Sequence, residues 1–258
     1  MTAGDAAVGI LVGLVSGVLS GLFGVGGGIV MTPGIQVLLG ASPIVALATP
    51  LPAIFPTAAT GAYTYRRSGE LDARAALWMA VPGVAAAAGG AALTDVVDTH
   101  VLLIVTAALL GYQAVGILRL RGRSAARVER ERAVTAVGYA EIGILAGFVS
   151  GLLGIGGGLV MVPLMAGMLG MPLKRALGTS LLAIVVLVVP GTIVHAALGH
   201  IDWAIFAVVT VGAVPGARLG AKLALGSRER TLRLLVGSFL LLVAITYGVD
   251  ELAALARG

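Results

Sequence analysis

The chain contains the same glycine-rich segment twice, once in each half. Residues 20–33 read SGLFGVGGGIVMTP, and residues 150–163 read SGLLGIGGGLVMVP. The interval between the two copies is too long for a solenoid repeat. It suits the duplicated halves from which many membrane transporters are built. The same shift, here called the repeat offset, aligns five further pairs, which are Leu47 and Leu177, Thr49 and Thr179, Gly61 and Gly191, Gly69 and Gly199, and Asp72 and Asp202.

Composition places both halves in lipid. Apolar residues make up 59% of the chain and charged residues 11%, and the mean hydropathy is +1.06. A soluble domain carries about 25% charged residues, so this chain has too few to cover a surface that faces water. No basic segment precedes the first apolar stretch, which we expect to be a retained helix. The absence of cysteine excludes disulfides, thiolate nucleophiles and cysteine-based metal sites.

The long apolar runs are rich in alanine and leucine and lack the alternation of a barrel strand, which predicts membrane-spanning helices. We predict an all-α integral membrane protein with two repeats of about five helical segments each. Residues 1–119 form the N-terminal repeat, residues 120–133 an arginine-rich cytoplasmic linker, and residues 134–258 the C-terminal repeat. The expected segments are 5–23, 28–40, 43–65, 75–94 and 100–119, then 134–153, 158–170, 173–198, 203–225 and 231–249.

The positions of the charges predict how these segments are threaded. With the N-terminus outside and five crossings per half, sixteen of the seventeen lysines and arginines fall on the cytoplasmic side. An even number of crossings would scatter them over both faces. Five crossings also make the second half enter from the opposite side, so we predict inverted repeats with both termini outside. The pI of about 10.1 then reflects topology and a solvated linker, and we expect no nucleic-acid partner.

Each glycine run is predicted to break its helix, because glycine costs a helix about 1 kcal/mol relative to alanine. The segment after each run has about thirteen residues, or roughly 20 Å, which is short of the roughly 30 Å hydrocarbon core. Amide groups at the start of such a short helix can hold an anion near the membrane midplane. Tight helix packing through small residues is the alternative interpretation. The glycines assigned to the substrate site are Gly24, Gly26, Gly27, Gly28, Gly154, Gly156, Gly157 and Gly158.

Five polar side chains are further candidates for the substrate site. The hydroxyls of Thr49, Thr179 and Ser180 lie near the expected starts of helices, where they either donate to an anion or bond back to helix carbonyls. Gln36 is either a ligand donor or a contact between helices. Arg218 has the planar fork that suits oxyanions, whereas snorkelling to the headgroups is the alternative.

Two titratable residues are candidates for proton coupling. Glu141 is the one carboxylate well inside an apolar segment, and a buried carboxylate can carry a proton. It can also reach the interface or pair with an arginine. His195 is of a type that titrates near neutral pH, although a structural role is the simpler interpretation. Neither residue has an equivalent in the other half, where Leu11 and Tyr65 stand at the matching positions.

These motifs resemble the sulfite exporter TauE/SafE family of membrane transporters. The resemblance rests on the doubled glycine segments, on Val162 and Pro163, and on residues 176–181, which read ALGTSL. It covers nearly the whole chain and implies transport of small sulfur-containing anions, such as sulfite and organosulfonates, across the inner membrane. In the first half Pro50 stands where the second half has Ser180, which makes a symmetric role for that serine doubtful.

The sequence therefore favours a multi-pass protein of the cytoplasmic membrane that moves a small anionic solute by alternating access. No nucleotide-binding motif is present, so an ion gradient must drive transport, and protons are our choice. An anion channel and an integral-membrane enzyme are the alternatives, although the chain has no metalloprotease motif and no nucleophile elbow. We expect no cofactor and no metal, and a homodimer is one of the oligomeric states left open.

Overall fold

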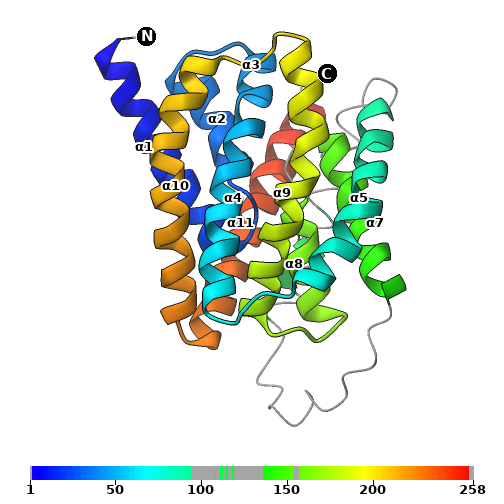
Figure 1. Cartoon of the computed structure of the whole chain (residues 1–258). Coiled ribbons are helices and arrows are strands. Elements are labelled where there is room, and N and C mark those ends of the chain that lie inside the picture. The colour runs from blue at the N-terminus through cyan, green and yellow to red at the C-terminus, as the bar shows by residue number, and fades with distance from the viewer. Residues whose placement is uncertain are drawn as a thin grey trace.

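The computed structural model describes residues 2–93, 136–153 and 157–255, together with positions 108, 111, 112, 114, 115 and 118. Every regular element within these residues is an α-helix, and the helices form one bundle (Figure 1). The predicted all-α class is therefore confirmed for the described part of the chain. The predicted linker 120–133 and most of the predicted segment 100–119 lie outside it.

The helix boundaries follow the predicted segments closely. Four stretches of the described chain are long and apolar enough to cross a membrane, namely α1, α3 together with α4, α9 and α10. α2 and α8, which follow the glycine runs, are short as predicted, although with 11 and 10 residues each ends before the expected segment does. The bounds are α1 (Ala3–Phe23), α2 (Gly28–Leu38), α3 (Pro43–Ala48), α4 (Pro50–Arg67), α5 (Ala73–Leu93), α7 (Ala136–Leu153), α8 (Gly158–Gly167), α9 (Leu173–Ala197), α10 (Trp203–Gly226) and α11 (Glu229–Leu255).

α1 and α10 approach each other closely through a stripe of glycines. A Cβ atom built on Gly13 would lie 2.0 Å from the backbone oxygen of Val209, and one on Gly17 would lie 2.2 Å from that of Ala213. No side chain fits at these distances, so the two backbones are in direct contact. Small residues are the usual means by which helices pack in a membrane, where there is no hydrophobic force between them.

α5 and α7 pair in the same way, through residues that are the repeat equivalents of those between α1 and α10. A Cβ on Gly143 would lie 2.0 Å from the oxygen of Met79, and one on Gly147 would lie 2.1 Å from that of Gly83. Gly143 and Gly147 are the repeat equivalents of the α1 glycines, and Met79 and Gly83 are those of the α10 residues. Each half thus supplies one helix to each pair, while α4 packs against α9 between them.

The loops that precede α5 and α10 also repeat. Gly69 and Gly199 end the preceding helix turns with φ of 74° and 70°. Three residues later, Asp72 accepts a hydrogen bond from the N–H of Ala75 at 3.0 Å, and Asp202 accepts from two amides at the start of α10. An aspartate at a helix N-cap satisfies donors that have no partner in the helix. The aligned glycine and aspartate pairs in the sequence therefore mark two equivalent turns.

The two halves differ at the centre of the bundle. In the first half the helix is divided at Thr49 into α3 and α4, where Pro50 and Pro52 remove backbone donors. In the second half α9 runs unbroken past Thr179 and Ser180, and its internal proline is Pro190. Prolines inside a helix remove hydrogen bonds and kink or break it, which accounts for the division in the first half.

The two ends of the bundle differ in charge. α1 begins, and α11 ends, at the upper end in Figure 1, whereas the turns α4–α5, α8–α9 and α10–α11 lie at the lower end. Basic side chains of the described residues collect at the helix ends that meet these lower turns, namely Arg66, Arg67, Arg74, Lys174, Arg175, Arg228, Arg230 and Arg233.

Candidate anion site at the glycine hairpins

The first glycine run forms a hairpin between α1 and α2. α1 ends at Phe23, and Gly24 follows it with φ of 70°. Gly26 and Gly27 have φ of 84° and 85°, and Gly27 is the N-cap of α2. Residues with a side chain rarely adopt this left-handed region, so the turn depends on glycine. Residues 24–28 are all buried, which places this irregular backbone inside protein, as a membrane requires.

The second glycine run ends in the same geometry. Gly157 has φ of 65° and is the N-cap of α8, which begins at Gly158. A Cβ on either N-cap glycine would lie 3.2 Å from a backbone oxygen of the preceding helix, that of Ser16 for Gly27 and that of Ala146 for Gly157. The remaining glycines of the predicted site lie outside the described residues, namely Gly154 and Gly156.

The two hairpins are in contact with each other. A Cβ on Gly158 would lie 2.4 Å from the oxygen of Gly24 and 2.8 Å from the Cα of Val25. The side chain of Ile184, from α9, packs on both hairpins, because its methyl groups lie 3.2 Å from the Cβ position of Gly26 and 2.7 Å from that of Gly158. Segments from opposite halves of the sequence thus meet backbone to backbone.

The start of α2 carries hydrogen-bond donors without a partner. The N–H groups of Gly28 and Ile29 make no hydrogen bond within the described part of the chain, whereas those of Val30 and Met31 donate to the oxygen of Gly27 at 3.2 and 3.1 Å. No side chain caps this helix end, and α8 begins in the same way. Free amides at the positive end of a helix dipole attract an anion.

Two carbonyl groups where α1 meets the first hairpin accept hydrogen bonds from side chains. The hydroxyl of Tyr65 donates to the oxygen of Gly21 at 2.9 Å, and that of Ser180 donates to the oxygen of Gly24 at 2.8 Å. Ser180 also lies 2.9 Å from the oxygen of Leu177. Its single hydroxyl proton is therefore engaged by protein in this conformation. The ligand role suggested for Ser180 stays a prediction, and its position beside the hairpin is now established.

Thr49 and Thr179 tie the two halves together. The hydroxyl oxygen of Thr179 accepts a hydrogen bond from the backbone N–H of Asp72 at 3.0 Å, and that of Thr49 accepts one from the N–H of Asp202 at 3.1 Å. Both threonines are fully buried, and each bond joins a central helix to the N-cap turn of the other half. These contacts account for the aligned threonines structurally. Their role as anion ligands stays a prediction.

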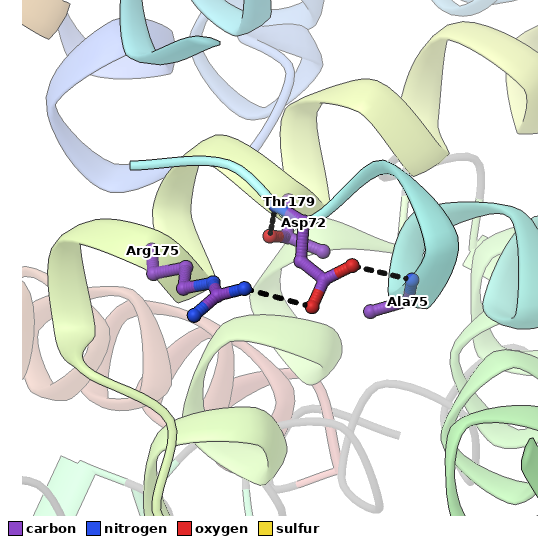
Figure 2. A network of polar contacts seen from close by, with 4 residues as sticks. All are labelled: Asp72, Ala75, Arg175 and Thr179. Atoms are coloured by element: carbon purple, nitrogen blue, oxygen red, sulfur yellow. Dashed lines mark hydrogen bonds and ion pairs between the residues drawn. The ribbon is translucent and has the colours of Figure 1, made fainter. Parts of the chain in front are cut away.

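One of these two ties carries a charge pair that the other lacks. Nη2 of Arg175 lies 3.1 Å from Oδ2 of Asp72, whose other carboxylate oxygen accepts from the N–H of Ala75 (Figure 2). At the equivalent position to Arg175 the first half has Val45. Both charged side chains are partly exposed, at 42% and 25%, so the pair is worth about 1 kcal/mol at most.

The remaining predicted residues lie away from the hairpins. The side chains of Gln36, Arg218 and Glu141 are exposed on the outer faces of α2, α10 and α7. His195 lies in the last turn of α9, with its Nδ1 3.2 Å from Nδ1 of His200. None of the four is among the nearest neighbours of the described hairpin glycines, whereas Ser180 is. Their assigned roles in binding and proton coupling stay predictions.

The structure adds two residues that the sequence reading did not select. Ser16 and Ser20 are fully buried, and their hydroxyls have no hydrogen-bond partner in the described chain. The signal available in the sequence was a pair of serines one helical turn apart, in an apolar helix immediately before a glycine run.

Comparison with known proteins agrees with this architecture. The family model of the sulfite exporter TauE/SafE matches residues 9–247. A probable membrane transporter protein of Xylella fastidiosa (strain Temecula1) is 32% identical over 87% of this chain and 88% of its own length. The Bacillus subtilis proteins YdhB and YunE, also named probable membrane transporter proteins, are 34% and 27% identical over 83% and 91% of this chain, and over 88% and 94% of their own lengths. No solved structure matches the chain.

The match spans nearly all the described helices and both glycine hairpins. The relatives are named probable membrane transporter proteins, which agrees with a bundle in which four described stretches are long and apolar enough to cross a bilayer. The chain therefore belongs to the sulfite exporter TauE/SafE family of membrane transporters.

Proposed function

We propose that this protein is a secondary active transporter that carries small anions of the sulfite and organosulfonate type across the cytoplasmic membrane. The observation that carries the proposal is the meeting of two helix breaks, where Gly158 contacts Gly24 beside the free amides of Gly28 and Ile29. The family description supports a sulfur oxyanion as the solute. Amide donors in a buried site stabilise an anion although they carry no full positive charge. The empty carrier therefore leaves no buried charge without a partner when it passes through its occluded state.

The proposal includes two repeats of inverted topology. Contacts that recur at the repeat offset with the partners exchanged, such as Gly13 with Val209 and Gly143 with Met79, are what a pseudo-two-fold axis generates. In Figure 1 α1 runs downward from the upper end, whereas its equivalent α7 runs upward from the lower right. If this axis is parallel to the membrane, the two hairpins lie at the same depth, and the chain enters them from opposite sides of the membrane.

Alternating access would work through the two ties between the halves. The bond from Asp72 to Thr179 lies at the arginine-rich end of the bundle, and the bond from Asp202 to Thr49 belongs to the opposite end. Rocking of one half against the other opens one tie while the other stays closed. Of these two bonds, only the one between Asp72 and Thr179 is accompanied by an ion pair among the described residues, which Arg175 forms with Asp72. The conformation that is closed at the arginine-rich end therefore differs in stability from the one that is closed at the opposite end.

Protons are the coupling ion in this proposal, and Glu141 and His195 are the candidate carriers. Glu141 is exposed on α7, and His195 faces His200 at the end of α9. Neither side chain is among the nearest neighbours of the described hairpin glycines. Proton binding would therefore act through movement of the helices and not by direct contact with the anion.

Flux in proteoliposomes tests the proposed function. With methanesulfonate or sulfite as solute, we expect transport that saturates with concentration, responds to an imposed pH gradient and is absent from protein-free liposomes. Flux that follows the electrochemical gradient without saturation would identify a channel. If neither anion moves under any gradient, the assignment to sulfur oxyanions is wrong.

Labelling of single cysteines tests the proposed topology. The chain has no cysteine of its own, so each substitution adds the only thiol. The exposed positions Ala3 and Leu198 belong to one end of the bundle, and Ser68 and Gly226 belong to the other. We expect an impermeant maleimide applied to intact cells to label Ala3→Cys and Leu198→Cys, and to label Ser68→Cys and Gly226→Cys only after permeabilisation, because the arginine-rich end is cytoplasmic. Ser68 and Leu198 are repeat equivalents, so labelling of Ser68→Cys and Leu198→Cys from the same side would contradict the inverted arrangement.

A further inference from the structure

Ser16 and Ser20 present two unpaired hydroxyls on one face of α1. They are one helical turn apart, both have no exposed surface, and neither Oγ has a hydrogen-bond partner within the described part of the chain. A buried polar group without a partner destabilises a protein, so each instance in a native structure requires an explanation.

The usual arrangement for a hydroxyl in an apolar helix is a bond back to the carbonyl four residues earlier. Several residues of this chain follow it, for example Thr57 to the oxygen of Ala53 at 2.6 Å and Thr192 to that of Val188 at 2.8 Å. Ser16 and Ser20 do not, although they lie in a helix of the same kind. Their donors are therefore available to a group that the described residues do not supply.

The two serines lie against the start of α2. A Cβ on Gly27, the N-cap of α2, would lie 3.2 Å from the backbone oxygen of Ser16 and 3.4 Å from the Cβ of Ser20. The next two amides, those of Gly28 and Ile29, are the unpaired N–H groups at the positive end of the helix. Two buried serines with unpaired hydroxyls thus lie next to the N-cap of α2 and its two unpaired amides. Hydroxyl and amide N–H groups are the kinds of donor from which a small oxyanion accepts hydrogen bonds.

We propose that Ser16 and Ser20 donate to the oxygen atoms of the transported anion, at the start of α2, so that one anion binds per chain in the first repeat. This inference rests on the proposed function and deepens it by assigning the side-chain donors. The second repeat has Ala146 where the first has Ser16, so only one hydroxyl, that of Ser150, faces the equivalent N-cap. The duplicated hairpins are therefore unequal in donors, and the first hairpin is the principal site.

Binding of methanesulfonate to the purified full-length protein, followed by calorimetry and by thermal unfolding, tests the inference. We expect Ser16→Ala and Ser20→Ala each to weaken binding by about tenfold, and the double variant by about a hundredfold. Without ligand, the melting temperature of each variant should stay the same or rise, because the substitution removes an unpaired buried donor. A structural role for the serines predicts the opposite, a lower melting temperature with affinity retained.

Two matched variants complete the test. Thr57→Val removes an equally buried hydroxyl that already has a partner in its own helix, and Ser150→Ala makes the same change in the second repeat. Both should bind methanesulfonate with an affinity within about twofold of the wild type. An unchanged affinity in the double serine variant, or a loss in Ser150→Ala as large as in Ser20→Ala, would overturn the assignment to the first repeat. If the wild-type protein binds neither methanesulfonate nor sulfite, the proposed function itself fails, and this inference fails with it.

Discussion

Replacing Gly158 with alanine is expected to remove most of the transport activity. The new Cβ would lie 2.4 Å from the oxygen of Gly24 and 2.8 Å from the Cα of Val25, distances that real Cβ contacts do not show. Both neighbours are backbone atoms, so the hairpins themselves must separate. Overpacking of this kind costs about 1–3 kcal/mol, which lowers the ratio of intact to separated hairpins by about fivefold to a hundredfold or more. Proteoliposome flux of methanesulfonate measures the effect.

Gly167→Ala is the matched control for this experiment. Gly167 is the last residue of the same helix, α8, its φ is not in the left-handed region, and a Cβ on it would meet nothing within 4 Å. Flux through this variant should equal that of the wild-type protein. Normal flux through Gly158→Ala would show that contact between the hairpins is not needed for transport, and the proposed site would then have to be moved.

The largest effect on folding is expected from Gly17→Val. The Cβ of the new side chain would overlap the oxygen of Ala213 at 2.2 Å, and its two methyl groups have no space between α1 and α10. The helices must then separate along their whole contact, which Gly13 and Gly21 share. We expect a loss of about 3 kcal/mol or more, the upper part of the range for overpacked cores. Loss of the monodisperse peak in size-exclusion chromatography, with a lower melting temperature, would report it.

The equivalent helix pair, α5 with α7, allows a second test of this prediction. Gly147→Val should fail to a similar degree, since its Cβ would lie 2.1 Å from the oxygen of Gly83 in the equivalent α5–α7 pair. Gly89→Ala in α5 is the control, because its Cβ meets nothing within 4 Å and alanine favours a helix over glycine by about 1 kcal/mol. A well-folded Gly17→Val protein would mean that α1 and α10 do not depend on backbone contact.

The positions of the helices follow from local sequence. Proline and glycine act on the backbone of their own segment, so the start of α2 at Gly28, the start of α8 at Gly158 and the break at Thr49 were predictable from residues within one helical turn. The repeat offset also identified Thr49 with Thr179 and Asp72 with Asp202. It did not reveal that each threonine bonds to the aspartate of the opposite turn, because those partners are 107 and 153 residues apart.

Candidate ligands chosen by residue type lie away from the glycine hairpins, and their roles stay predictions. Arg218, Gln36 and Glu141 carry the chemistry that an anion or proton carrier needs, but each is exposed and not buried inside the bundle. The direction of a side chain depends on which face of the helix its neighbours cover, and α10 turns its glycines and alanines toward α1. Ser16 and Ser20 were missed for the converse reason, since serine looks the same in a sequence whether its hydroxyl is bonded or free.

The sequence by itself determined that this protein is a duplicated bundle of apolar helices with two breaks, because composition and backbone propensity are local properties and a repeat is visible in the letters alone. Only the tertiary structure decided that the breaks touch, that Thr49 and Thr179 join the halves, and that the hydroxyls of Ser16 and Ser20 have no hydrogen-bond partner among the described residues. Those outcomes depend on which surfaces meet when α4 packs on α9 and α1 packs on α10. Contacts between segments so far apart are set by the whole packing arrangement and not by any one stretch of chain.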